Sequence, residues 1–208
     1  MKKLISILGI ALLIPILSVA DEEIAPRPLS FSGGNFSDAV FTILPPKYDD
    51  SRKVVKEPFG VAYRLDSDGN LNELYRTKGW YAFQVYLSPS GRYLVRMGPW
   101  NRGRRPDKDD LALAIYDNGI LLKSYSTADL VKDHDKVEAS VSHYSWQASS
   151  LIDNGQYSAG ERFKMIPNLG YNSLFEIHTI DGWTYTFDVT NGQIKSETRT
   201  KEWLKEAK

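Results

Sequence analysis

The sequence predicts an all-β protein made of antiparallel hairpins, and three observations support this. Between Tyr81 and Tyr125, apolar and polar side chains alternate with a period of two, which is typical of half-buried strands. Turn sequences that contain Gly, such as Asp117-Asn118-Gly119, separate the alternating segments because Asn and Gly tolerate positive φ. The chain also holds 12 Tyr, 8 Phe and 5 Trp, which pair well across strands.

The region 81–125 predicts four consecutive strands, at 83–87, 92–97, 111–116 and 120–125. Ser88-Pro-Ser-Gly91 joins the first two, because Pro presets φ at the second turn position and Gly accepts positive φ at the fourth. The Asp117-Asn118-Gly119 turn joins the last two. A unit of four strands and about 45 residues has the size and form of one propeller blade.

The run from Leu87 to Val95, LSPSGRYLV, is followed after a polar loop by LAIYDNG, from Leu113 to Gly119. Together these runs resemble a TolB-type (WD40-like) β-propeller repeat, which carries an S-P-D-G hairpin and then an aromatic-x-x-D-x-x-G hairpin. Ser90 replaces the usual Asp, and the second hairpin is one residue shorter than the common form. The blades of that family mostly serve as binding scaffolds, so the resemblance implies a binding role and no catalytic residues.

The first twenty residues predict a signal peptide. Lys2 and Lys3 precede an apolar run from Leu4 to Leu17, and Ser18-Val19-Ala20 is a small-residue cleavage site. The apolar run is short for a membrane span, so we expect cleavage near Ala20 and no membrane insertion afterwards. We expect a signal peptide at 1–20, an extended leader at 21–35 and a single β domain at 36–208, in the periplasm or outside the cell.

Composition narrows the classes of partner. Removing Lys2 and Lys3 from the 26 basic residues leaves 24 against 26 acidic ones, a formal charge near −2. This balance argues against nucleic-acid binding, as does export. The sequence has no Cys, which excludes disulfides, thiol chemistry and a lipid anchor on cysteine. We expect no cofactor.

The remaining elements are expected on both sides of the central unit. Before it, strands at 36–44 and 59–65 flank a charged loop at 47–56, and the chain returns over 71–75. After it, Thr127 is expected to cap one or two helical turns within 127–139. The last expected strands are 142–150, 163–166, 173–179, 184–189 and 193–198, followed by a short amphipathic C-terminal helix over 201–208.

One pattern recurs three times: an aromatic or apolar residue, then Asp, a turn, Gly and an apolar residue. It lies at Tyr63–Leu71, Ala114–Leu121 and Thr186–Ile194, and each copy predicts the outer hairpin of one blade. The spacing is irregular and three blades cannot close a ring. The sequence therefore leaves open propeller-blade-like units, a β-sandwich or partial barrel, and turn chemistry that any meander acquires.

The loop from Gly98 to Asp110 is the main candidate binding site, because loops on rigid scaffolds carry function. Arg102, Arg104 and Arg105 are candidates to clamp an anionic group such as a carboxylate or phosphate. Trp100 is a candidate to stack on a sugar or peptide. The alternative is a solvated loop whose arginines are balanced by its own aspartates.

Other patterns are better explained by structure. His143 and His178 are expected to be half-buried sheet residues, since a metal site needs more ligands than three His and no Cys supply. Asp66-Ser-Asp-Gly69 is expected to be a hairpin turn rather than a calcium loop. The sequence has no G-x-S-x-G or S-x-x-K motif, so we expect no catalytic residues.

We therefore expect an exported, non-catalytic binding or scaffold protein whose partner is an envelope protein or a glycan. The alternative is a cell-envelope hydrolase that acts on glycan or peptidoglycan through a carboxylate pair in an aromatic cleft. A third reading is a structural subunit of an envelope complex. The sequence does not set the oligomeric state.

Overall fold

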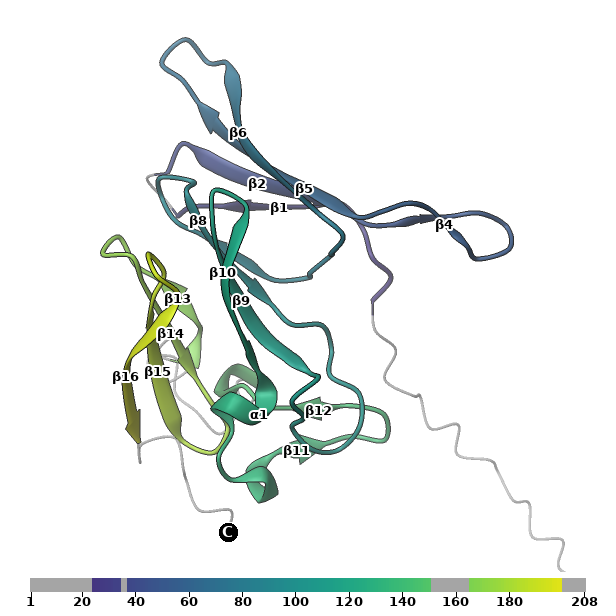
Figure 1. Ribbon diagram of the computed structural model, residues 1–208, viewed down its shortest axis with the longest axis vertical. Helices are drawn as coiled ribbons and strands as arrows, with labels where there is room; N and C mark the ends of the chain where they lie inside the picture. The colour runs from purple at the N-terminus through teal and green to yellow at the C-terminus, as the bar shows by residue number, and fades with distance from the viewer. Residues whose placement is uncertain (1–23, 35–36, 151–164, 200–208) are drawn as a thin grey trace, which may run out of the picture.

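Three four-stranded antiparallel sheets make up the computed structural model, which describes residues 24–34, 37–150 and 165–199 (Figure 1). This confirms the all-β meander predicted from the sequence. In the described part of the chain, neither helical segment has the length or apolar character to cross a membrane.

Each sheet is a meander in which strands pair with their neighbours. The first sheet contains β1 (Leu29–Ser32), β2 (Ala39–Leu44), β5 (Phe59–Leu65) and β6 (Leu71–Lys78). The second contains β7 (Val85–Leu87), β8 (Tyr93–Met97), β9 (Leu111–Asp117) and β10 (Ile120–Ser126). The third contains β13 (Asn168–Leu169), β14 (Leu174–His178), β15 (Trp183–Asp188) and β16 (Gln193–Arg199).

Small elements connect and extend these sheets. The hairpin β3 (Lys47–Tyr48) and β4 (Val54–Lys56) lies between β2 and β5 in sequence. A second hairpin, β11 (Glu138–Ala139) and β12 (Tyr144–Ser145), lies between the second and third sheets in sequence. The helical segments are α1 (Thr127–Leu130) and a 3-10 turn at His134–Lys136.

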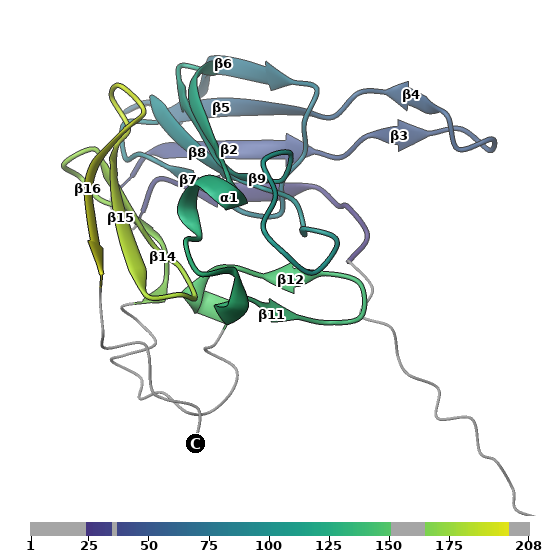
Figure 2. The ribbon, with the colours of Figure 1, turned by 60° about the horizontal axis from the view of Figure 1, so that its bottom comes forward.

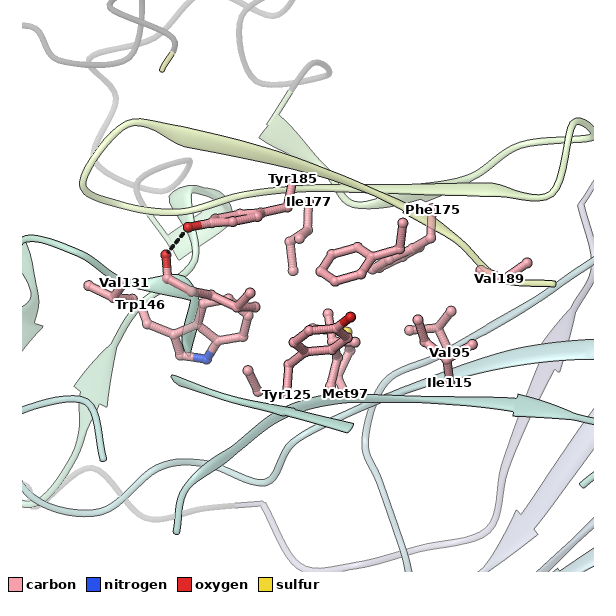
Figure 3. Close-up of a cluster of buried hydrophobic side chains, with 14 of the residues drawn as sticks. Val95, Met97, Ile115, Tyr125, Val131, Trp146, Phe175, Ile177, Tyr185 and Val189 are labelled. Carbon is pink, nitrogen blue, oxygen red and sulfur yellow. Dashed lines mark hydrogen bonds between the residues drawn. The ribbon is translucent and has the colours of Figure 1, made fainter. Parts of the chain in front are cut away.

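Strands β8 and β9 of the second sheet are covered on both faces, which places this sheet at the centre of the stack. Along β9, Ala114 and Tyr116 belong to the cluster shared with the first sheet, whereas Leu113 and Ile115 belong to the cluster shared with the third. Successive residues of a strand point to opposite faces, so a strand covered twice becomes a continuous apolar run. Figure 3 shows the second cluster, where aromatic side chains of the third sheet meet β8, β9 and β10.

The recurring pattern forms a hairpin at all three places, and each turn joins the third and fourth strands of its sheet. Two turn glycines also form the joint to the preceding sheet. Gly119 has φ 79°, and a Cβ there would lie 2.8 Å from the ring of Tyr75 on β6. At the next joint, the Tyr125 hydroxyl donates to the carbonyl of Gly192 at 2.9 Å. The turns therefore do more than close hairpins: they hold one sheet against the next.

The first strands of the sheets lie together, with β7 beside both β1 and β13. The strands thus run outward from a common inner edge, and the sheets stack in chain order. This arrangement is a row of three blade-like units rather than a two-layer sandwich (Figures 1 and 2).

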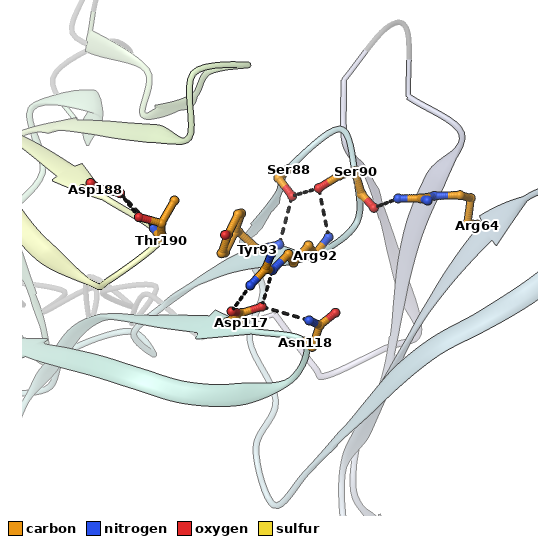
Figure 4. Close-up of polar contacts among 9 residues, drawn as sticks. All are labelled: Arg64, Ser88, Ser90, Arg92, Tyr93, Asp117, Asn118, Asp188 and Thr190. Carbon is orange, nitrogen blue, oxygen red and sulfur yellow. Dashed lines mark hydrogen bonds and ion pairs between the residues drawn. The ribbon is translucent and has the colours of Figure 1, made fainter.

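The two turns of the central motif are cross-linked. Arg92 forms a bidentate pair with Asp117, with Nε–Oδ1 and Nη2–Oδ2 distances of 2.7 Å (Figure 4). This paired guanidinium lowers the pKa of the Asp117 carboxyl below its usual value. In the other turn, Ser88 Oγ accepts from the backbone N–H of Tyr93 at 2.9 Å, and its carbonyl accepts from Gly91 at 2.8 Å.

Two predicted segments differ from the structure near the amino end. The leader expected at 21–35 contributes β1, which pairs in register with β2. The loop expected at 47–56 forms the β3–β4 hairpin, which projects from the body (Figure 2). Both strands of this hairpin are exposed and carry charged side chains. Their sequence therefore shows no apolar alternation.

Three further expectations need correction between the sheets. Ser126 rather than Thr127 caps α1, because its side chain and that of Asp129 form a reciprocal capping box. Of the strand expected at 142–150, only Tyr144–Ser145 pairs as a strand. In the strand expected at 163–166, the described residues 165–166 are not strand. The expected signal peptide and C-terminal helix lie outside the described residues.

Candidate functional site

A cavity of about 610 Å³ opens beside the end of β8 and the start of β7. Segments far apart in the sequence line it: residues before β7, the loop after β8, the chain from β12 onward, and one residue of the amino-terminal segment. Its described lining residues are Ile24, Phe83, Gln84, Met97, Gly98, Pro99, Trp100, Asn101, Tyr144, Ser145, Trp146, Gln147, Ser149 and Ser150. This volume lies in the range of ordinary small-molecule sites.

Three dipeptides in this lining pair an aromatic residue with an amide residue. They are Phe83-Gln84, Trp100-Asn101 and Trp146-Gln147. We call the cavity the aromatic–amide pocket. Among its described lining residues there is no Asp, Glu, His, Lys or Arg. The lining therefore offers apolar surface and neutral hydrogen-bonding groups.

Gly98 sets the path of the chain from β8 into the loop. Its N–H donates to the carbonyl of Ala112 at 2.8 Å. A Cβ at this position would lie 1.7 Å from the carbonyl oxygen of Leu111, so only glycine permits this close approach. The following residues are thereby turned toward the pocket.

The same loop is joined to the segment that carries β12. The backbone N–H of Tyr144 donates to the carbonyl of Asn101 at 3.1 Å, and Gly103 donates to Ser142 at 3.2 Å. Between them, Arg102 and His143 form an isolated antiparallel bridge. These bonds fix the two halves of the pocket wall relative to each other.

A buried hydroxyl network supports this junction from behind. The hydroxyl of Tyr144 lies 2.7 Å from Asp110 Oδ2 and 2.7 Å from Thr127 Oγ1. Thr127 is fully buried and also bonds the backbone of Asp107. Burial raises the pKa of the Tyr144 phenol above its usual value, so the hydroxyl stays protonated and donates to Asp110.

Trp100 is half-buried and lines the pocket. Its ring packs against His143 with a centroid distance of 3.8 Å and an interplanar angle of 51°. His143 is itself held by a 2.6 Å hydrogen bond between its Nδ1 and Ser140 Oγ. The indole is therefore oriented before any ligand arrives, and its N–H bonds to no other residue in the described ranges.

Asn101 is the most unusual residue of the pocket. Its side chain is nearly fully buried, yet its Oδ1 has no hydrogen-bond partner among the described residues. An unpaired buried acceptor costs about 1–3 kcal/mol, so such groups are rare and need an explanation. The Oδ1 atom is sealed from solvent, so Asn101 lines the open pocket through its other atoms.

The three candidate arginines lie on the exposed part of the loop. Arg102, Arg104 and Arg105 are exposed and do not line the aromatic–amide pocket. Arg104 borders a smaller cavity of about 410 Å³ beside the β11–β12 hairpin, and Arg105 lies 4.0 Å from the exposed carboxylate of Asp135. Of the four residues proposed from the sequence, only Trp100 is among the described lining residues of the pocket.

The other sequence candidates also have local partners. His178 is buried and bonds Thr184 Oγ1 at 2.8 Å, with Glu176 3.3 Å away, whereas His143 bonds Ser140. In the described ranges, no three His, Cys, Asp or Glu side chains gather closely enough to hold a metal. Asp66 accepts hydrogen bonds from Asp68 and Asn70, as expected of a hairpin turn.

Sequence reasoning missed Asn101 and all the pocket residues outside the Gly98–Asp110 loop. The available signal was the repetition of aromatic–amide dipeptides at positions 83, 100 and 146. A fourth such dipeptide, Tyr171-Asn172, does not line the pocket, so the signal alone is not specific. No protein-family model matches the chain, and no curated protein matches it in sequence.

Proposed function

We propose that this is an exported, non-catalytic binding protein whose ligand occupies the aromatic–amide pocket. The observation that carries this proposal is the preoriented ring of Trp100 in a pocket whose wall also carries three side-chain amides. Aromatic surface with a few well-placed polar groups is the usual composition of a small-molecule site. The propeller-like sheets serve as the rigid frame.

The neutral lining favours binding over hydrolysis. A glycoside hydrolase with two carboxylates needs both at the cleft, about 5–10 Å apart. The described lining of the aromatic–amide pocket supplies none. Asp110, the nearest carboxylate in the network, already accepts a hydrogen bond from Tyr144.

The test is a ligand screen that reports both binding and turnover. Intrinsic tryptophan fluorescence and thermal shift would be measured for the purified protein, the Trp100→Ala variant and the Tyr171→Ala variant. Tyr171 is a matched control because it is a 70% exposed aromatic that precedes an amide but lies outside the pocket. We expect ligands that bind the wild type and Tyr171→Ala but not Trp100→Ala.

Mass analysis of the recovered ligand tests the non-catalytic part of the proposal. An unchanged ligand mass after long incubation is expected, and a cleaved ligand would support the hydrolase instead. Export is tested separately by sequencing the amino terminus of the protein isolated from its native cells. A terminus at Asp21 is expected, and retention of Met1 would contradict export through a cleaved signal.

A further inference from the structure

The pocket also indicates the chemical class of its ligand. We infer that the aromatic–amide pocket binds an uncharged saccharide, with a sugar ring stacked on Trp100 and hydroxyl groups bonded to Asn101 and the neighbouring amides. This inference rests on the proposed binding function and adds the ligand class to it.

The first argument is charge. An ionised group taken into the pocket would lose water and meet no opposite charge among the described lining residues. The arginines of the same loop do not compensate, because Arg102, Arg104 and Arg105 lie outside the pocket. A carboxylate, phosphate or ammonium ligand is therefore disfavoured.

The second argument is the aromatic surface. One face of a pyranose ring presents C–H groups, and such a face packs on a flat aromatic ring. Trp100 supplies the largest ring of any side chain, and Phe83 provides a second half-buried ring in the same lining. Because His143 already holds Trp100 in place, binding loses little side-chain entropy.

The third argument is the match between amides and hydroxyls. A carboxamide offers two donors and an acceptor, and a hydroxyl both donates and accepts, so the two pair in either direction. Asn101, Gln84 and Gln147 supply amides from three separate segments of the wall. An alkyl chain would instead leave these amides without partners.

The test compares neutral saccharides with a charged one. Binding of cellotetraose, maltotetraose, xylotetraose and chitotetraose would be measured by calorimetry. Tetraglucosamine is the charged counterpart of chitotetraose, because it carries amines in place of acetamides. An uncharged peptide, N-acetyl trialanine amide, tests the competing ligand class. We expect at least one neutral tetrasaccharide to bind, and tetraglucosamine and the peptide to bind at least about ten-fold more weakly.

Variants then locate the bound sugar. Trp100→Ala and, independently, Asn101→Leu are each expected to weaken saccharide binding at least about ten-fold, since a site built for a hydroxyl loses its partner. Tyr171→Ala is expected to change it less than about two-fold. Far-UV circular dichroism of each variant checks that the fold is retained, and Asn101→Leu serves if Trp100→Ala does not fold.

The outcomes separate the inference from the proposed function. Binding of the peptide or tetraglucosamine with no neutral saccharide bound would overturn the saccharide inference and leave the binding function standing. Saccharide binding that survives both pocket substitutions would also overturn it. No binding by any ligand class in this set or in the broader screen would overturn both.

Discussion

Asn101→Leu provides the sharpest test of the pocket, because stability and binding should change in opposite directions. Asn101 is 4% exposed, its Oδ1 has no partner in the described structure, and its backbone φ is not in the left-handed region. Leu has a similar size and no buried acceptor to leave unpaired. Its backbone carbonyl would still accept from Tyr144. The substitution should therefore stabilise the free protein.

The unpaired acceptor sets the expected magnitude. Removing it should raise the free energy of unfolding by about 1–3 kcal/mol. In a domain of this size, each kcal/mol corresponds to about 2–4 °C in Tm. Denaturant and thermal unfolding followed by circular dichroism would measure the change, and calorimetry with the tetrasaccharide that binds best would measure affinity. A stabilised variant that binds at least about ten-fold more weakly is the expected result.

Tyr75→Phe is the matched control. Tyr75 is 8% exposed, and its hydroxyl is another buried group with no partner in the described structure, but it lies at the joint with Gly119 rather than in the pocket. Tyr75→Phe should be neutral or stabilising and should leave binding unchanged. The opposite outcome is that Asn101→Leu lowers the free energy of unfolding by more than about 1 kcal/mol while Tyr75→Phe does not. That result would mean that the Asn101 amide is paired in the free protein, and it would refute the expected stabilisation.

Three other substitutions test the frame and the loop. The triple replacement of Arg102, Arg104 and Arg105 with Ala should change the free energy of unfolding by less than about 1 kcal/mol, since these side chains are exposed. A larger drop in Tm would show that they stabilise the sheets. Gly98→Ala should lower the free energy of unfolding by about 3 kcal/mol in urea titrations, because its Cβ meets backbone rather than a movable side chain. Asp117→Asn should lower Tm at pH 7. Because the folded-state pKa of Asp117 is depressed, its stabilisation is complete above the unfolded pKa of about 3.9 and is lost as the pH falls through the folded value. A difference in Tm between variant and wild type that stays constant from pH 7 to pH 2 would contradict the role of the ion pair.

Local pattern accounts for the strands that pair within a hairpin. The strand at 59–65 and the three strands after residue 173 were predicted to within one or two residues, because alternation and a Gly turn are both short-range signals. The segment at 29–32 was missed as a strand for the opposite reason. Four residues beside Pro and Gly carry little periodicity, and their pairing with β2 is set by the sheet.

The site could be predicted only in part, because its walls meet through tertiary contacts. Trp100 was singled out from the loop that carries it, and the structure places it in the lining of the pocket. Its partner wall lies within the segment 142–150, which was predicted as a strand although it is shaped by bonds to Asn101, Gly103 and Thr127. No spacing rule connects positions more than 40 residues apart. Patterns within one loop therefore favoured the neighbouring arginines as binding residues over the amides that lie far away in sequence.

The three sheets also show why the pocket lies where it does. The same connection, between the second and third strands, differs in each sheet. It carries the β3–β4 hairpin in the first, the Gly98–Asp110 loop in the second, and only residues 179–182 in the third. Since the tight turn is sufficient to build a sheet, the frame does not require the longer connections. The extra residues of these connections are therefore available for contacts outside the sheets. In the second sheet, the loop places Trp100 and Asn101 in the lining of the aromatic–amide pocket.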